Sequence, residues 1–384
     1  MTVRLLLALG LVSVLSACST APVVKPAELP GFKPVAQLTH VWDANIGKAG
    51  GYIFSPASDG ESAYAAGSDG QIVKLDLASG RELWRIDTGK PLSAGVGVGE
   101  GLVLVGTPKG EVLAFKAADG APVWNARLGG EILVAPYAAD KVVAARTLEG
   151  KVWLLEADTG KVRWSNSHTL PALIDREQSD LLVRQSGVFV GYPGGRLVLL
   201  ALNNGAPVWE SAVSLPKGAT ELERMSDVTG LLALDEHQVC AAAFQGRVAC
   251  FDRDTGNLNW AREVSSTKGV SMDEKQAYVA DEHGRLFAYD KIRGVNSWKQ
   301  DKLLDRKLSS PTGIAGRFIA VGDFEGQVHL LSVEDGSFAA RAATDGSEIR
   351  GESLPLRSGV VVQTANGAVV AFRVSGIGDQ GSAK

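Results

Sequence analysis

The chain is built from short runs of apolar, often β-branched residues that alternate with tight, glycine-containing turns. In one such stretch, the apolar run 72–75 is followed by a polar turn that ends at Gly80 and by a segment that carries Trp84. Short runs of this kind, bounded by turn residues, predict β-strands. No long segment shows a helical period, so the pattern predicts an all-β protein.

This stretch is one copy of a repeat. In six copies a glycine is followed ten residues later by a second glycine and four residues after that by a tryptophan: Gly70-Gly80-Trp84, Gly110-Gly120-Trp124, Gly150-Gly160-Trp164, Gly195-Gly205-Trp209, Gly246-Gly256-Trp260 and Gly284-Gly294-Trp298. A seventh copy has Gly326 and Gly336 but Ala340 at the tryptophan position, and an eighth begins at Gly367. Successive first glycines lie 38 to 51 residues apart. A period near forty that holds several short strands is typical of β-propellers.

Each repeated residue has a physical role. The first glycine ends a pair such as Asp69-Gly70 between two apolar runs, which predicts a two-residue hairpin in which the glycine adopts a positive φ. The second glycine closes the next turn. The tryptophan stands at one fixed place in each repeat, so we expect it to pack against the neighbouring blade rather than to bind a ligand.

The two ends of the chain complete each other. The last repeat stops after the apolar run 369–374, one strand short of a four-stranded blade, and the segment from Leu38 to Trp42 has the pattern of the missing strand. Pairing of this N-terminal strand with the C-terminal blade would close the ring and remove its open edge. The sequence therefore predicts an eight-bladed β-propeller of four-stranded antiparallel blades over residues 34–375, followed by a C-terminal tail over 376–384.

The N-terminus has the pattern of an export signal. Residues 1–17 combine a basic start, a short apolar run and small residues, as in a secretory signal peptide. The segment from Leu15 to Cys18 resembles the lipobox of bacterial lipoproteins, which implies cleavage before Cys18 and attachment of lipid, including palmitate, to that cysteine. Three prolines within 19–33 predict a flexible, extended tether over 18–33. In the resembled lipoproteins an aspartate after the cysteine favours the inner membrane, so Ser19 implies a lipid-anchored protein on the periplasmic side of the outer membrane.

The remaining two cysteines flank one hairpin. Cys240 and Cys250 lie almost symmetrically about the turn at Gln245-Gly246. An exported chain meets oxidising conditions, so a cross-strand disulfide is one expectation and a pair of buried free thiols is the other.

Charge and composition exclude several functions. The net charge of −4 argues against nucleic-acid binding, which needs a strongly basic surface. The five histidines are scattered without metal-ligand spacing, so no metal site is predicted, and no group of residues has the pattern of a catalytic site.

Two connections between repeats are longer than the others. They follow Trp164 and Trp209, should emerge from neighbouring blades on the same face of the ring, and mix apolar residues with charges. Function concentrates on loops that a rigid scaffold positions, and arginine beside aliphatic residues suits a protein interface. The candidate partner-binding residues are Leu173, Arg176, Arg224 and Asp227. The alternative is that both connections are tolerated insertions with solvated charges.

The repeat is similar to that of pyrroloquinoline-quinone dehydrogenases. Together with the lipoprotein signal, the eight repeats, the length and the two long connections, it resembles the BamB (YfgL) family, the lipoprotein subunits of the outer-membrane β-barrel assembly (BAM) machinery. The resemblance implies that the two connections contact the periplasmic domains of BamA, the central barrel protein, through Leu173, Arg176 and Asp227, with Arg224 added from its neighbourhood. The chain departs from the family pattern at Asp175, where a leucine is common, and at Thr229, where an aspartate is common.

The resemblance implies a non-enzymatic adaptor without a cofactor, monomeric within a hetero-complex. It also implies a second, weaker role in guiding unfolded outer-membrane proteins, for example by strand addition to an exposed edge. Two alternatives remain. One is a periplasmic dehydrogenase that uses pyrroloquinoline quinone, although such enzymes are usually longer and many carry an adjacent cysteine pair. The other is a propeller scaffold of a different envelope complex.

Overall fold

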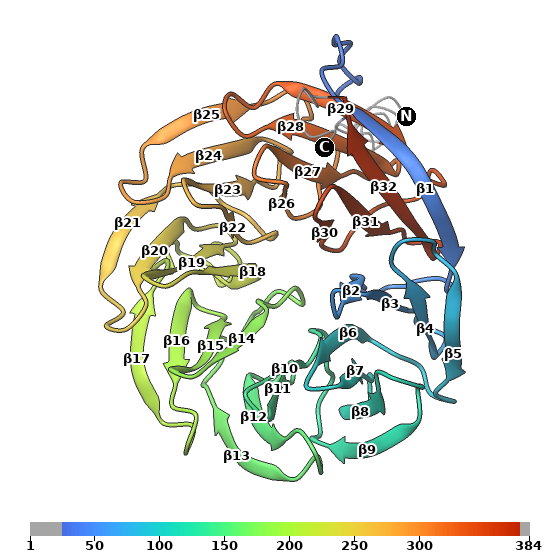
Figure 1. Ribbon diagram of the computed structural model, residues 1–384. Coiled ribbons are helices and arrows are strands. Elements are labelled where there is room, and N and C mark those ends of the chain that lie inside the picture. The colour runs from blue at the N-terminus through green and yellow to red at the C-terminus, as the bar shows by residue number, and fades with distance from the viewer. Residues whose placement is uncertain (1–24, 377–384) are drawn as a thin grey trace, which may run out of the picture.

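The computed structural model describes residues 25–376, and every regular element in that range is a β-strand. The strands form eight four-stranded antiparallel sheets arranged around a central axis (Figure 1). The predicted eight-bladed β-propeller is therefore confirmed. Within the described residues no helix is long and apolar enough to cross a membrane.

From its inner to its outer strand, each of blades 1 to 7 follows the chain, and blade 8 ends with the first strand of the chain. Blade 1 comprises β2 (Ala57–Ser58), β3 (Ser62–Ala66), β4 (Gln71–Asp76) and β5 (Glu82–Asp87), and blade 2 comprises β6 (Ala94–Gly99), β7 (Leu102–Gly106), β8 (Glu111–Lys116) and β9 (Pro122–Arg127). Blade 3 comprises β10 (Tyr137–Ala139), β11 (Val142–Arg146), β12 (Lys151–Glu156) and β13 (Val162–Ser167), and blade 4 comprises β14 (Leu181–Arg184), β15 (Gly187–Tyr192), β16 (Arg196–Leu200) and β17 (Pro207–Ala212). Blade 5 comprises β18 (Val228–Leu234), β19 (Gln238–Ala243), β20 (Val248–Asp252) and β21 (Leu258–Arg262), and blade 6 comprises β22 (Ser271–Met272), β23 (Gln276–Ala280), β24 (Leu286–Asp290) and β25 (Asn296–Gln300). Blade 7 comprises β26 (Thr312–Ile314), β27 (Phe318–Gly322), β28 (Gln327–Ser332) and β29 (Phe338–Ala343), and blade 8 comprises β30 (Leu354–Leu356), β31 (Gly359–Gln363), β32 (Ala368–Ser375) and β1 (Gln37–Asn45).

The ring is closed by the N-terminal strand. β1 pairs with β32 in antiparallel register from Gln37 opposite Ser375 to Asn45 opposite Ala368. The predicted pairing of the N-terminal strand with the C-terminal blade is confirmed, and blade 8 is built from both chain ends (Figure 1).

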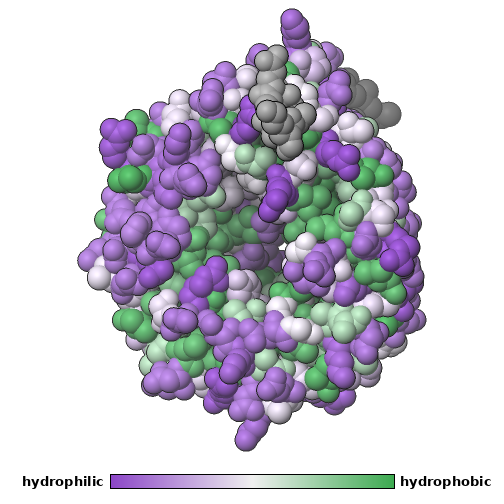
Figure 2. Space-filling view, viewed as in Figure 1, coloured by the Kyte–Doolittle hydropathy of each residue, from purple (hydrophilic) through white to green (hydrophobic). Residues whose placement is uncertain are grey.

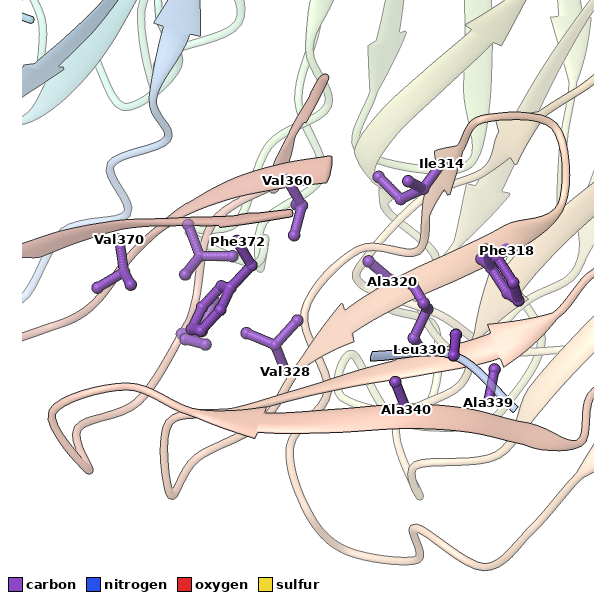
Figure 3. Close-up of a cluster of buried hydrophobic side chains, with 13 residues drawn as sticks. Ile314, Phe318, Ala320, Val328, Leu330, Ala339, Ala340, Val360, Val370 and Phe372 are labelled. Atoms are coloured by element: carbon purple, nitrogen blue, oxygen red, sulfur yellow. The ribbon is translucent and has the colours of Figure 1, made fainter. Parts of the chain in front are cut away.

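The core lies between neighbouring blades. Figure 3 shows one such cluster, in which Ala320 and Leu330 of blade 7 face Val360 and Phe372 of blade 8. These side chains are at most 2% exposed. Burial of a large aliphatic or aromatic side chain is worth roughly 1.5–3 kcal/mol, so each blade is stabilised mainly by its two neighbours.

The repeated tryptophan and second glycine form one contact between blades. Trp124 on β9, for example, donates from Nε1 to the Ala157 carbonyl of blade 3 at 2.7 Å, and its ring lies where a Cβ on Gly160 would come within 2.6 Å. The same pairing recurs at all seven docking tryptophans: Trp42 on Gly80, Trp84 on Gly120, Trp124 on Gly160, Trp164 on Gly205, Trp209 on Gly256, Trp260 on Gly294 and Trp298 on Gly336. The predicted docking role of the tryptophans is confirmed, and the glycine is required because any side chain would displace the indole.

Blade 7 lacks the tryptophan for a topological reason. The third and fourth strands of blade 8 are the two chain ends, so no turn joins them and no glycine would receive an indole from β29. Residues 25–36, here called the N-terminal strap, lie beside β29 instead (Figure 1), where Val35 and Ala36 donate to the Ala339 carbonyl at 3.0 and 3.1 Å. The structure differs here from the expected flexible tether over 18–33, because residues 25–33 pack against the propeller. Residues 18–24 lie outside the described residues.

The hairpins differ in detail from the prediction. The connection between β3 and β4 spans four residues, 67–70, rather than two, and it is closed by hydrogen bonds from Gly67 N to Gln71 O and from Gly70 N to Gly67 O. Gly70 has the expected positive φ of 103°. In blade 5 the positive φ falls on Gln245 (47°) instead of Gly246.

Candidate docking surface

All eight connections from an outer strand to the next inner strand lie on one face of the ring, because every blade has the same strand order. The two longest join blades 3, 4 and 5. They are residues 168–180, called docking loop 1, and residues 213–227, called docking loop 2; the face that carries them is called the docking face.

Asp227 fastens the two docking loops together. Its Oδ2 accepts a hydrogen bond from the backbone N–H of Asp175 in docking loop 1 at 2.6 Å. Its Oδ1 accepts from the N–H of Gly194, in the turn between β15 and β16, at 3.0 Å. One carboxylate at the end of docking loop 2 therefore sets the position of the neighbouring loop, and the expected adjacency of the two connections is confirmed.

Asp227 is only 1% exposed. Burial raises the pKa of its carboxyl group, and the backbone donors of Asp175 and Gly194 partly offset that rise. A buried carboxylate is costly even when it is hydrogen-bonded, so its presence is weak evidence for a stabilising role. The geometry assigns Asp227 to positioning docking loop 1, and its own side chain does not reach the surface.

Leu173 and Arg176 lie at the surface of docking loop 1. Leu173 is 41% exposed, although it is a large apolar residue. The Arg176 side chain is 64% exposed, and its Nη2 lies 2.8 Å from Oε2 of Glu131, in the connection between β9 and β10. An exposed ion pair of this kind is worth no more than about 1 kcal/mol, so the guanidinium is available to a partner at small cost.

Docking loop 2 presents a short turn at 221–224. Arg224 forms an ion pair with Glu221 in the same turn, and Leu222 beside it is 62% exposed. Glu223 accepts from the N–H groups of Ala219 and Thr220 at 2.8 and 3.0 Å, which closes the preceding bend. Docking loop 2 therefore carries an exposed aliphatic residue beside an arginine, as docking loop 1 does.

Arg146 lies buried beneath docking loop 1. It stands at the end of β11 and is fully buried. Its Nη1 donates to the Ser179 carbonyl at 3.2 Å, to Ser179 Oγ at 3.1 Å and to the Gly191 carbonyl at 2.7 Å. These bonds join blade 3 to blade 4 at the C-terminal end of the loop, and burial lowers the pKa of the guanidinium to about 10.

Two further contacts hold docking loop 1 at its ends. His168, its first residue, stacks on Tyr192 with ring centroids 4.2 Å apart, and Arg146 lies 5.5 Å from the same tyrosine ring. Glu177 forms an ion pair of 3.3 Å with Lys268, in the connection between blades 5 and 6. Residues of blades 3 and 4 and of three neighbouring connections thus fix this loop.

The two positions that depart from the family pattern are both turned inward. Asp175 donates its backbone N–H to Asp227, and its Oδ1 accepts from the N–H of Glu177 at 2.7 Å. Thr229 is fully buried, and its hydroxyl donates to the Ser266 carbonyl at 3.2 Å. Both residues support the loops from within.

Sequence reasoning missed Arg146, Glu131 and Lys268. A signal for Arg146 existed in the repeat. Four residues before the first glycine, six of the eight copies have alanine or glycine, whereas Arg146 and Gln363 are large and polar. Both turn out to bond across to a neighbouring blade, Gln363 through a 2.8 Å bond to the Ala66 carbonyl. Glu131 lies in a connection with no unusual pattern, and Lys268 ends a Ser-x-x-Lys match that lacks the companion motifs of a catalytic site.

The centre of the ring is hollow. Figure 2 shows this depression, with apolar residues on its walls and polar residues on the surrounding surface. The cavity has a volume of about 940 Å³ and is lined by the inner strands and by Asp180 and Glu352. Burial raises the pKa of Asp180 to about 6 and that of Glu352 to about 8. Over residues 25–376, no group of three or more His, Cys, Asp or Glu residues is placed to hold a metal ion.

Cys240 and Cys250 form a disulfide in this structure. They occupy directly opposed positions on β19 and β20, and both are fully buried. The bond lies in blade 5, within the sheet that follows docking loop 2.

The comparisons with known proteins agree with the fold. Residues 68–300 match the family model described as outer membrane protein assembly factor BamB. The outer membrane protein assembly factor BamB of Nitrosomonas eutropha is 42% identical over 349 residues, which cover 91% of this chain and 85% of that protein. The crystal structure of BamB from Moraxella catarrhalis is similar with a TM-score of 0.80 at 26% identity, over 88% of this chain and 99% of that one.

A more distant likeness concerns the fold alone. A quinohemoprotein alcohol dehydrogenase from Pseudomonas putida superposes with a TM-score of 0.72 at 14% identity, over 91% of this chain and 78% of that chain. Identity this low shows a shared propeller architecture and no shared activity. The family model and the close relatives show that this chain belongs to the BamB family of outer membrane protein assembly factors.

Proposed function

We propose that this protein is a non-catalytic adaptor subunit of the outer-membrane β-barrel assembly (BAM) complex, and that its docking face holds the periplasmic domains of BamA. The observation that carries the proposal is the fastening of docking loops 1 and 2 to each other by Asp227. A loop that is ordered before binding loses little entropy on association, which favours affinity. The names of the relatives place the family in outer membrane protein assembly.

The exposed residues on this framework suit a protein partner. Leu173 supplies apolar area, and Arg176 and Arg224 supply donors for carboxylates or backbone carbonyls. Each arginine already has a glutamate within reach, Glu131 or Glu221, so neither is an uncompensated charge in the free protein. Asp227 contributes indirectly, because it holds Asp175 and therefore the segment that carries Arg176.

The rest of the proposal concerns the envelope. Residues 1–17 serve as signal peptide, and lipid on Cys18 anchors the chain to the periplasmic side of the outer membrane; both segments lie outside the described residues. The propeller itself then works in the periplasm, bringing BamA and unfolded barrel proteins together. The tail over 376–384 has no assigned role.

The experiment is co-purification of the lipidated protein with endogenous BamA. Wild type is compared with Leu173→Ala and Arg176→Ala. Matched controls are Leu258→Ala, which removes a leucine that is 50% exposed on the outer strand of blade 5, and Arg81→Ala, which removes an exposed arginine on the opposite face. Thermal unfolding of each variant verifies that the propeller is intact.

The expected result is that wild type and both controls retain BamA, whereas Leu173→Ala and Arg176→Ala lose most of it. Each hot-spot truncation should weaken binding by about tenfold or more, since such residues contribute at least 1–2 kcal/mol. Retention of BamA by both docking-loop variants would move the interface elsewhere on the ring. Absence of BamA from the wild-type preparation would refute the adaptor role itself.

A further inference from the structure

The N-terminal strap crosses the height of blade 7 from one face to the other. At its start, Ala27 donates to the Leu304 carbonyl at 2.9 Å, and Leu304 lies in the connection between β25 and β26, on the docking face. At its end, Val35 and Ala36 bond to Ala339, near the beginning of β29, and the chain then enters β1. Because β1 runs toward the docking face, Gln37 lies on the opposite face.

Two arginine side chains of the propeller donate hydrogen bonds to backbone carbonyls of the strap. Arg306, whose side chain is 4% exposed, donates from Nη1 to the Ala27 carbonyl at 3.1 Å and from Nε to Asp323 at 2.7 Å. Arg341 donates from Nη2 to the Pro30 carbonyl at 3.2 Å and from Nε to His329 Nδ1 at 3.1 Å.

Behind the arginines, the network is closed and buried. Asp323 and His329 are fully buried, and His329 Nε2 lies 3.0 Å from Asp323 Oδ2. Burial lowers the pKa of His329, so a neutral ring that accepts from Arg341 and donates to Asp323 satisfies the geometry. Asp323, His329 and Arg341 lie in the blade that lacks a docking tryptophan, and Arg306 lies in the connection that precedes it. Arg306 also forms an ion pair with the more exposed Glu325, and one terminal nitrogen of each arginine donates to the strap.

Apolar contacts complete the seat of the strap. Leu29 and Phe32 pack against a cluster that contains Leu303, Leu308 and Phe338, and the rings of Phe32 and Phe338 stack with centroids 5.5 Å apart. Leu29 and Phe32 thus pack at the junction of blades 6 and 7, where Trp298 is also buried, whereas Ala36 at the end of the strap is buried between blades 7 and 8.

From these contacts we infer that the strap selects the face from which the membrane anchor leaves, and turns the docking face toward the membrane surface. The inference rests on the proposed lipid attachment at Cys18. If the chain were free up to Gln37, it would leave from the opposite face with a reach of about 65 Å for nineteen residues. Because the chain is held at Ala27, the linker to the lipid leaves from the docking face. The nine residues between Ala27 and Cys18 span about 32 Å at most.

The consequence is geometric. The linker from Cys18 to Ala27 is short and ends on the docking face. It therefore keeps docking loops 1 and 2 on the membrane-proximal side of the ring. The partner that fits this arrangement is an anionic or zwitterionic lipid surface reached through the anchor, with the protein partner bound in the space between ring and membrane.

The test uses the full lipidated protein in vesicles of phosphatidylethanolamine and phosphatidylglycerol with a trace of headgroup-labelled acceptor lipid. Donor dyes are attached to single cysteines in blade 2, either Lys109→Cys in the β7–β8 turn on the docking face or Ala118→Cys in the β8–β9 turn on the opposite face. Both positions are exposed. The native cysteines of the described residues are joined in the disulfide, so they do not compete for the dye.

The strap is released by the double substitution Leu29→Ser and Phe32→Ser. The matched control is Val35→Ser, at a strap residue that is 56% exposed. Hydrogen exchange of the Ala27, Val35 and Ala36 amides reports release directly. It should accelerate by about a hundredfold in the double variant, which corresponds to about 2.7 kcal/mol of lost burial, and should not change in the control.

In wild type and control, we expect more energy transfer from the docking-face dye than from the opposite-face dye, and the double variant should lose this difference. Equal transfer from both dyes in wild type, or greater transfer from the opposite face, would overturn the inference while leaving the anchor proposal intact. Failure of the protein to float with vesicles would instead refute lipid attachment and the inference with it. A retained difference in the double variant, with its strap amides exchanging rapidly, would show that something other than the strap sets the orientation.

Discussion

The substitution Asp227→Asn tests whether Asp227 acts by positioning docking loop 1 or by touching the partner protein directly. The substitution keeps the size of the side chain but replaces one acceptor oxygen by an amide that donates. One of the two bonds, to Asp175 N–H at 2.6 Å or to Gly194 N–H at 3.0 Å, is therefore lost and a buried donor is left without an acceptor. Loss of such a charge-assisted bond costs roughly 1.5–3 kcal/mol locally.

The global free energy of unfolding should change less than this local figure. Burial raises the folded-state pKa of Asp227 above its unfolded value, so the ionised carboxyl group costs stability above its unfolded pKa, and the cost disappears as the pH falls below that value. A neutral asparagine avoids that cost at neutral pH. The two effects oppose each other in the whole molecule, whereas in docking loop 1 only the loss of the acceptor counts.

The assay is hydrogen exchange at the Asp175 and Gly194 amides, combined with titration of the BamA periplasmic domains. A loss of about 2 kcal/mol in local stability should speed exchange at these amides by about thirtyfold. It should weaken the affinity for the BamA periplasmic domains by up to the same factor. The control is Asp87→Asn, since Asp87 is exposed and accepts only from Gly89 N–H, at 2.8 Å, outside both docking loops. Weakened binding with unchanged exchange at both amides would refute the reasoning, because Asp227 would then act by touching the partner itself.

Three further predictions concern the scaffold. Gly160→Ala should lower the free energy of unfolding by about 2–4 kcal/mol in urea titration, because Gly160 has a φ of +68° and a Cβ there would meet the Trp124 indole at 2.6 Å. Gly313 has open space around it, so Gly313→Ala should leave the free energy of unfolding nearly unchanged. Replacement of both Cys240 and Cys250 by alanine should cost about 2–3 kcal/mol in the same titration, as expected for a bond that closes a ten-residue loop, and an unchanged midpoint would mean that the thiols are not paired in the native protein. Glu352→Gln should raise the melting temperature at pH 8 but not at pH 4. With a folded-state pKa raised to about 8, the carboxyl group of Glu352 costs stability increasingly as the pH rises from about 4.5 to 8. The cost is at most about 3 kcal/mol at pH 7, and water in the open cavity reduces it further. A gain that is equal at both pH values would contradict the raised pKa.

Much of the fold could be predicted because the repeat encodes one contact between blades seven times over. The spacing from Gly150 to Gly160 to Trp164 fixes a turn, a glycine that receives an indole and an indole for the next blade, and this arrangement is local in sequence within each blade. The strap could not be predicted in the same way. Its residues read as a tether because prolines dominate them, and its seat is formed by residues such as Arg306 and Arg341, nearly three hundred positions away.

The sequence predicted the exposure of Leu173 and Arg176 but not the burial of Asp227. Exposed aliphatic and arginine side chains in long connections mark a surface, so Leu173 and Arg176 could be proposed from sequence. Whether Asp227 points outward or inward depends on one backbone N–H in the other loop, and no pattern in its own segment reports that. The sequence therefore favoured contact for a residue that the structure uses as a fastener.

The outer rim of the ring offers a reason why binding should concentrate on the docking face. Each outer strand presents an edge to the rim of the ring, and such an edge is a template for pairing with an extended chain. In all eight blades, however, the register between the third and fourth strands shifts near the fourth strand's docking position, as between Lys74 and Leu75 in blade 1. Such bulges increase the local twist and interrupt the edge as a template for pairing. The bulges thus protect the rim, and β29 is further covered by the strap. These register shifts disfavour strand addition at the rim.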